Sequence, residues 1–155
     1  MKLWNILFFL IVITIFISAC SISKPGDESL TTESEYEELP SKLKEEQIEI
    51  EVSVNNRNEG DEIIFLIENK GTTPIGFGRP IYIEKLINGV WYRIPYIRLE
   101  FTDDIGEVEP NSIFEDTIDL RYLDYQLTEG NYRAIKAFYG NEGKIILAAE
   151  FEISE

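Results

Sequence analysis

From residue 47 to the end of the chain, hydrophobic and polar residues tend to alternate, and each alternating run ends at a cluster of turn-forming residues. The clearest run is 47–54, in which Ile48, Ile50, Val52 and Val54 occupy every second position. A period of two places these side chains on one face of a half-buried β-strand. No segment of useful length in this part has helical spacing, so an all-β domain is predicted.

Further strands are predicted wherever β-forming residues lie between turn signals. Residues 62–68 contain a continuous apolar run, which is typical of a central strand. Asn88-Gly89 separates two β-rich runs, and this dipeptide is the strongest short-range signal of a β-hairpin. The predicted strands are 47–54, 62–68, 74–78, 80–86, 90–96, 112–120, 130–139 and 144–153. About seven or eight antiparallel strands favour an immunoglobulin-like β-sandwich over residues 47–155, with a small up-and-down barrel as the alternative.

The segment 127–138 predicts a tight corner that leads into a central strand. Gly130 lies two residues before Tyr132, where this strand begins. That spacing is typical of the tyrosine corner of Greek-key sandwiches, and glycine permits the backbone conformation that the corner needs. We therefore expect the Tyr132 hydroxyl to bond to a backbone group of the preceding corner.

The N-terminus differs from the rest of the chain. Lys2 precedes the apolar run 6–17, which fits the core of a signal peptide and is shorter than the ~20 residues that span a bilayer. Ile17-Ser18-Ala19-Cys20 follows and resembles the box of a bacterial lipoprotein signal. The resemblance implies removal of residues 1–19, diacylglycerol on the Cys20 thiol, and lipid anchoring to the outer face of the cell membrane. An uncleaved membrane helix is the alternative.

Residues 20–46 are predicted to form a flexible tether between the lipid and the domain. The segment is rich in Ser, Thr, Glu and Lys and has few apolar residues. Such a composition buries too little surface to offset the entropy lost on ordering.

Charge and residue usage exclude several functions. The chain has 29 acidic and 14 basic residues, for a net charge of -15. Nucleic acid phosphates repel such a chain, so nucleic acid is not an expected partner. With a single cysteine and no histidine, the chain forms no internal disulfide and supports no His-dependent catalysis.

No group of residues predicts a catalytic, cofactor or metal site. Asp103, Asp104, Glu107 and Glu109 lie close together, but such pairs arise by composition in an acidic chain. The aspartates of residues 103–124 lack the spacing of an EF-hand, so no Ca²⁺ site is predicted.

The best candidate for a binding surface lies on the predicted strand 90–96. Trp91, Tyr92 and Tyr96 are available to stack on a sugar or to contact a protein, with burial in the core as the alternative. Tyr92 and Tyr96 share parity, so we expect them on one face. Arg133 has the opposite parity to Tyr132, so it should point away from the core. We expect it to pair with an acid on a neighbouring strand, with an anion site as the alternative.

Several motifs occur in an order that resembles a known family. They are Glu68-Asn69-Lys70-Gly71, Phe77-Gly78, Asn88-Gly89-Val90-Trp91-Tyr92 and Gly130-Asn131-Tyr132-Arg133. Over residues 47–155 their order resembles the bacterial Ig-like domain family that is common in lipoproteins of Bacillus-type bacteria. The resemblance implies the sandwich fold and an extracytoplasmic location, and it implies no activity.

These observations predict a non-enzymatic, lipid-anchored cell-envelope protein that presents an Ig-like domain for binding or adhesion. The expected partners are the membrane, through the lipid on Cys20, and a cell-wall glycan or envelope protein. The alternative is an accessory, scaffold or inhibitor protein that docks on a membrane or envelope protein.

Overall fold

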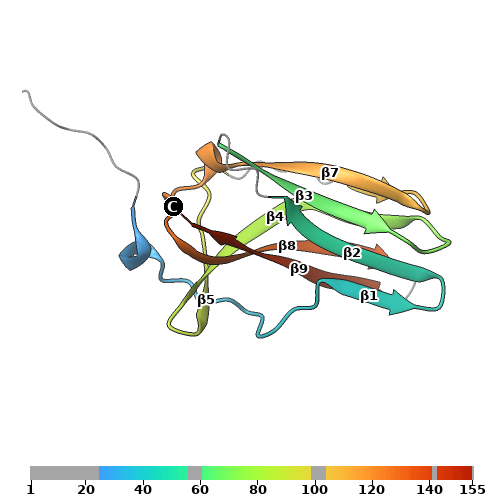
Figure 1. Cartoon of the computed structure of the whole chain (residues 1–155), viewed down its shortest axis with the longest axis horizontal. Helices are drawn as coiled ribbons and strands as arrows, with labels where there is room; N and C mark the ends of the chain where they lie inside the picture. Colours follow the sequence, from blue (N-terminus) through green and yellow to red (C-terminus); the bar gives the residue numbers. More distant parts are fainter. Residues whose placement is uncertain (1–24, 56–60, 99–103, 141–142, 155) are drawn as a thin grey trace, which may run out of the picture.

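A computed structural model describes residues 25–55, 61–98, 104–140 and 143–154. In these residues the chain forms two antiparallel β-sheets that lie face to face (Figure 1). The predicted signal peptide and Cys20 lie outside the described residues. Neither of the short helices that the structure describes has the length and apolar character of a membrane span.

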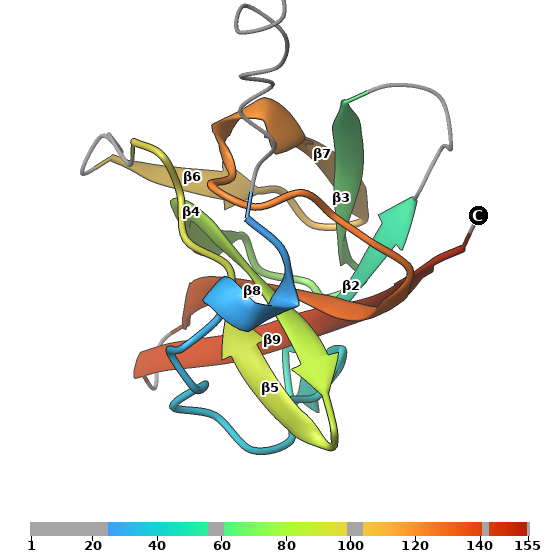
Figure 2. The ribbon, with the colours of Figure 1, turned by 90° about the vertical axis from the view of Figure 1, so that its left-hand side faces the viewer.

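The first sheet has the strand order β1-β2-β3-β7, and the second has the order β5-β4-β8-β9, with β6 paired to the beginning of β4. The first sheet consists of β1 (Lys42–Glu45), β2 (Ile48–Asn55), β3 (Glu62–Asn69) and β7 (Ser112–Asp119). The second consists of β4 (Ile75–Ile87), β5 (Val90–Arg93), β6 (Ile105–Val108), β8 (Gly130–Gly140) and β9 (Gly143–Ile153). Two 3-10 helices, η1 (Asp27–Ser29) and η2 (Leu120–Tyr122), lie at the end of the sandwich that faces the viewer in Figure 2.

This topology confirms the predicted immunoglobulin-like sandwich. Strands β2, β3 and β7 take the places of strands A, B and E of an immunoglobulin domain, and β5, β4, β8 and β9 take those of C′, C, F and G. The strands form two separate sheets in the described part of the chain, so the alternative of a closed barrel is wrong.

The structure corrects several strand boundaries. The runs 74–78 and 80–86 form the single strand β4, whose pairing register with β8 shifts between Phe77 and Ile81. The run 90–96 stops at Arg93, since Pro95 lacks the backbone N–H that a continuing ladder needs. Strands β1 and β6 have no counterpart among the predicted strands: both are short, and β1 lies in the segment that was assigned to the tether.

The core fills the space between the two sheets. It is built from alternate side chains of the central strands β3, β4 and β8, and it includes the fully buried rings of Phe65, Phe77 and Phe138. The rings of Phe77 and Phe114 join the two sheets, with their centroids 4.8 Å apart. Packing therefore holds together a sandwich that has no internal disulfide.

The corner before β8 has the geometry expected of a tyrosine corner. Tyr132 is fully buried, and its hydroxyl donates to the Thr128 carbonyl oxygen at 2.5 Å and accepts from the Thr128 amide at 3.0 Å. Gly130 has a φ of 144°, where a side chain would be strained. The Tyr132 ring stacks on Phe151 of β9, with 5.5 Å between centroids.

The prediction of a flexible tether is wrong for residues 25–46. Strand β1 pairs with β2 along its whole length, and residues 25–40, here named the strap, run along the second sheet (Figure 1). Leu30 enters the core and is 7% exposed. Apolar burial is small, as the composition indicates, but hydrogen bonds and ion pairs to the sandwich order the strap instead.

Removal of the Tyr132 hydroxyl tests the corner. In a Tyr132→Phe variant the Thr128 carbonyl and amide lose their partner, so the free energy of unfolding should fall by about 1 kcal/mol or more. Chemical denaturation measures the difference. Tyr139→Phe is the control, because Tyr139 is 41% exposed and its substitution should cost less than about 0.5 kcal/mol. Equal stability of Tyr132→Phe and the wild type would contradict a stabilising corner.

Candidate functional site

The strap covers the outer face of the second sheet, which would otherwise meet solvent. At one edge of the sheet, the Arg93 amide of β5 donates to the Thr32 carbonyl at 2.8 Å. At the opposite edge, the Ala148 amide of β9 donates to the Pro40 carbonyl at 3.0 Å. The strap therefore crosses from β5 to β9, and the side chains beneath it form the most elaborate polar arrangement among the described residues.

Arg133 of β8 is the side chain that holds the strap. It is 1% exposed, and its Nη2 and Nε lie 2.7 and 2.9 Å from Oε2 of Glu84 on β4. Its Nη1 donates to the Glu37 carbonyl at 2.7 Å, and its Nη2 donates to the Tyr36 carbonyl and the Ser34 hydroxyl, each at 3.0 Å. One guanidinium thus binds a buried carboxylate and three oxygens of the strap.

The backbone register explains why these two residues meet. Glu84 and Arg133 are direct neighbours in the β4–β8 ladder. Arg133 points away from the core between the sheets, as its parity predicts, and it pairs with an acid on the adjacent strand, as expected. The strap was not expected there, so the burial of the pair was not predicted.

Two further side chains flank the Glu84–Arg133 pair. The Arg133 guanidinium lies 4.4 Å from the Trp91 ring centroid, within the range of a cation–π contact. Nη2 of Arg93 lies 3.5 Å from Oε1 of Glu84, which has no hydrogen-bond partner among the described residues. Because Glu84 is fully buried, its charge has to be balanced by nearby cations. The two guanidinium groups supply that balance.

A second polar cluster fixes the beginning of the strap to the corner. Nζ of Lys85 is 2.8 Å from the Asp27 carboxylate, 3.1 Å from the Tyr125 hydroxyl and 2.5 Å from the Thr128 hydroxyl. The Tyr125 hydroxyl also donates to Asp27. Burial by itself lowers the pKa of Lys85, but the bonds to Asp27 and Tyr125 outweigh it and raise this pKa. For Asp27, burial raises the pKa, and the bonds from Lys85 and Tyr125 lower it overall. Both shifts favour the ionised pair.

A third ion pair joins the two sheets through the core. Lys136 of β8 has a fully buried side chain, and its Nζ lies 2.8 Å from the Asp116 carboxylate of β7 and 3.2 Å from the Arg79 carbonyl. Burial lowers the pKa of Lys136, and the bond to Asp116 opposes this only in part. This pair explains why Asp116 interrupts the apolar phase of its strand.

The structure does not place Trp91, Tyr92 and Tyr96 on one exposed face. Tyr92 and Tyr96 are half-buried and pack against the core, which was the alternative for them. Tyr96 lies beyond the end of β5, and its hydroxyl donates to the Ile81 carbonyl at 2.5 Å. Trp91 lies under the strap beside Arg133. Of the three predicted surface residues, only Trp91 therefore remains a candidate for ligand binding, together with the residues around it.

An open hollow of about 590 Å³ lies beside Trp91, between the strap and the β4–β5 hairpin. It combines aromatic rings with carboxylates, and its lining includes Glu33, Ser34, Tyr36, Glu37, Glu38, Gly89, Val90 and Trp91. Most of these residues belong to the strap. Sequence reasoning missed them because it assigned this segment to a solvated tether.

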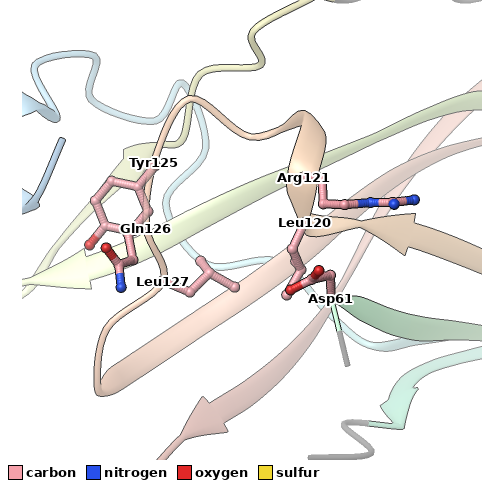
Figure 3. A pocket seen from close by; sticks show the side chains of 6 residues that line it. All are labelled: Asp61, Leu120, Arg121, Tyr125, Gln126 and Leu127. Atoms are coloured by element: carbon pink, nitrogen blue, oxygen red, sulfur yellow. The ribbon is translucent and has the colours of Figure 1, made fainter. Parts of the chain in front are cut away.

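A smaller hollow of about 320 Å³ lies between η2 and the corner (Figure 3). In this view the side chains of Leu127 and Leu120 point towards each other, and the lining residues Tyr125 and Gln126 lie on the other side of Leu127. Arg121 points away from the other labelled side chains in the view, and its guanidinium binds Asp119 at 2.6 Å. The described lining holds one carboxylate, Asp61, and thus no carboxylate pair for acid–base chemistry.

Of the four candidate carboxylates at residues 103–109, the structure describes Asp104, Glu107 and Glu109. Asp103 lies outside the described residues, Asp104 is paired with Arg79 at 2.6 Å, and Glu107 and Glu109 are exposed. Within the described part of the chain, no group of three or more acidic or Cys side chains is placed to hold a metal ion.

The two stacked sheets and the corner define an Ig-like sandwich domain. The chain belongs to the bacterial Ig-like domain family, whose model matches residues 44–152. The match begins inside β1 and ends inside β9, so the strap precedes it. Domains of this family are generally non-catalytic. A comparison with curated proteins finds no match.

Removal of the Arg133 guanidinium should destabilise the domain and release the strap. An Arg133→Met variant takes the main partner from the buried Glu84 carboxylate, so the free energy of unfolding should fall by about 3–5 kcal/mol. Chemical denaturation measures the loss, and limited proteolysis reports exposure of the strap. A double variant with Glu84→Met should recover part of the loss, since no unpaired charge then remains.

Arg121→Met is the control for this experiment. Arg121 also binds an acid, but its side chain is 69% exposed, so its removal should cost less than about 1 kcal/mol. If Arg133→Met were no more destabilising than Arg121→Met, the buried pair would not hold the strap.

Proposed function

We propose that this protein is a non-enzymatic, lipid-anchored protein of the bacterial cell envelope, whose Ig-like domain binds a partner at the cell surface. The observation that carries the proposal is membership of the bacterial Ig-like domain family over residues 44–152, since such domains act as surface or adhesion-type modules. The lipoprotein-like box ending at Cys20 supports the anchor. Burial of each methylene group of an acyl chain contributes about 0.8 kcal/mol of binding free energy, so two acyl chains are enough for stable attachment to the membrane.

The hollow beside Trp91 is the surface that best fits a binding role. Trp91 and Tyr36 supply aromatic faces, on which the apolar face of a sugar ring packs. Glu37 and Glu38 supply acceptors for sugar hydroxyl groups. This chemistry supports a cell-wall glycan as the partner.

A second candidate function is that of an accessory, scaffold or inhibitor protein that docks on a membrane or envelope protein. Strand β7 favours it, because it is the last strand of its sheet and presents a backbone edge to which a partner strand can add. Ile113 on β7 is 62% exposed and offers an apolar contact at this edge.

The anchor is tested with a Cys20→Ser variant. Metabolic labelling with a fatty-acid analogue should mark the wild-type protein, and the variant should lose both the label and the membrane-bound fraction, because the thiol that accepts the lipid is gone. Fractionation and in-gel detection measure both. Undiminished label in Cys20→Ser would refute the lipoprotein assignment.

The partner is tested with the chain from residue 20 onward carrying Cys20→Ser, which keeps the strap. This protein is mixed with purified sacculi and, separately, with solubilised membrane proteins. We expect retention on sacculi, reduced several-fold by Trp91→Ala and unchanged by Tyr139→Ala, an aromatic exposed by 41%. Retention by one membrane protein alone would favour docking at β7, and retention by neither would contradict a binding role at these two targets.

A further inference from the structure

The ordered strap shortens the connection between the domain and the lipid, and the inference below rests on the proposed anchor at Cys20. Only residues 21–24 separate Cys20 from Pro25, the first residue that the structure describes. Even fully extended, this connection reaches no more than ~18 Å. Pro25 is itself bound to the sandwich, since the Gln126 amide donates to its carbonyl at 3.3 Å. The end of the sandwich around Pro25 is thus held close to any bilayer that contains the lipid.

This end carries a pair of exposed hydrophobic residues. Ile97 and Tyr122 are 60% and 58% exposed, and the Ile97 amide donates to the Tyr122 carbonyl at 2.8 Å, so they are neighbours. Tyr96, which precedes Ile97, and Leu123, which follows Tyr122, form an antiparallel β-bridge. Figure 2 looks onto this end, where the first described residues run up towards the η2 segment that contains Tyr122.

We propose that Ile97 and Tyr122 form a membrane-contacting surface that enters the interfacial layer of the bilayer in which the Cys20 lipid is embedded. Burial of an isoleucine side chain in this layer is favourable. Tyrosine has an apolar ring and a polar hydroxyl, and it is enriched at the level of the headgroups for that reason. The adjacent Arg98 is exposed, and its long apolar stem lets its charge remain among the headgroups.

The net charge of the chain indicates whether this contact depends on charged lipid headgroups or on apolar insertion. The net charge is -15, and the exposed Asp61 and Asp124 lie in the segments around η2. An anionic surface repels such a protein. The contact therefore depends on apolar insertion, and it forms on a zwitterionic phosphatidylcholine bilayer.

The chain supplies a matched control for this surface. Ile113 is 62% exposed, close to the value for Ile97. It lies near the beginning of β7, whereas η2 follows the end of that strand. The rise of a strand places it ~20 Å from η2. Ile113 should therefore remain in water when the protein is anchored.

Site-specific fluorescence tests the proposal on the lipidated full-length mature protein. The chain has one cysteine, whose thiol carries the lipid, so an Ile97→Cys substitution provides a single site for a polarity-sensitive label. An Ile113→Cys protein is labelled in the same way, and Tyr122→Cys serves as a second reporter of the surface. Each is reconstituted into phosphatidylcholine vesicles with and without lipid that carries a nitroxide quencher at the headgroup.

We expect quenching by the nitroxide lipid to be several-fold greater at positions 97 and 122 than at position 113. If the proteins float with the vesicles but all three labels are quenched equally weakly, the membrane-contacting surface is overturned and the lipid anchor stands. If the wild-type protein does not float with the vesicles, the anchor is overturned and the inference with it.

Discussion

The buried pair between Arg133 and Glu84 is the interaction on which the outer face of the second sheet depends. Burial of two charges costs more than their attraction returns unless the remaining hydrogen-bonding groups are satisfied as well. Arg133 approaches this condition because three oxygens of the strap accept from its Nη1 and Nη2 groups. The strap and the ion pair therefore require each other: without the strap, the guanidinium would face water, and without the guanidinium, the strap would lose its central attachment.

The way in which the strap is held explains its unremarkable composition. Arg133 binds the carbonyls of Tyr36 and Glu37, and the edge strands β5 and β9 also bind backbone groups of the strap. Backbone recognition fixes the path of a segment and places few demands on its side chains. A polar, serine- and glutamate-rich sequence is thus compatible with an ordered structure, although its composition is that of a disordered linker.

Features that neighbouring residues determine could be predicted from the sequence, whereas features that depend on distant residues could not. The strands of the sandwich and the Asn88-Gly89 turn depend on neighbouring residues, and the turn has the positive φ values of 51° and 83° that its sequence indicates. The partners of Arg133 in the strap lie almost a hundred positions away in the sequence, so no local pattern predicts them. Lys136 is a related case, because it is buried on β8 and its partner Asp116 lies on the other sheet, twenty positions away.

Proline has opposite effects at two positions in the second sheet. Pro80 did not end β4, because the strand absorbs it where the register with β8 shifts. Pro95 did end β5, so Tyr96 lies beyond the strand that it was expected to share with Tyr92, and both rings pack against the core. The candidate binding surface consequently moved from the strand alone to the hollow that the strand forms with the strap.

The strap also changes what the proposed anchor does to the domain. A flexible connection of residues 20–46 would let the sandwich sample many orientations above the membrane. With residues 25–40 bound to the sheet, the same anchor acts on the end of the sandwich that contains η1 and η2. With the proposed anchor, the free length would be too short for the domain to turn over, so the opposite end, with the turn between β6 and β7, would point away from the bilayer. A partner in the cell wall would meet that end and the sides of the sandwich first, and the hollow beside Trp91 lies on one of these sides.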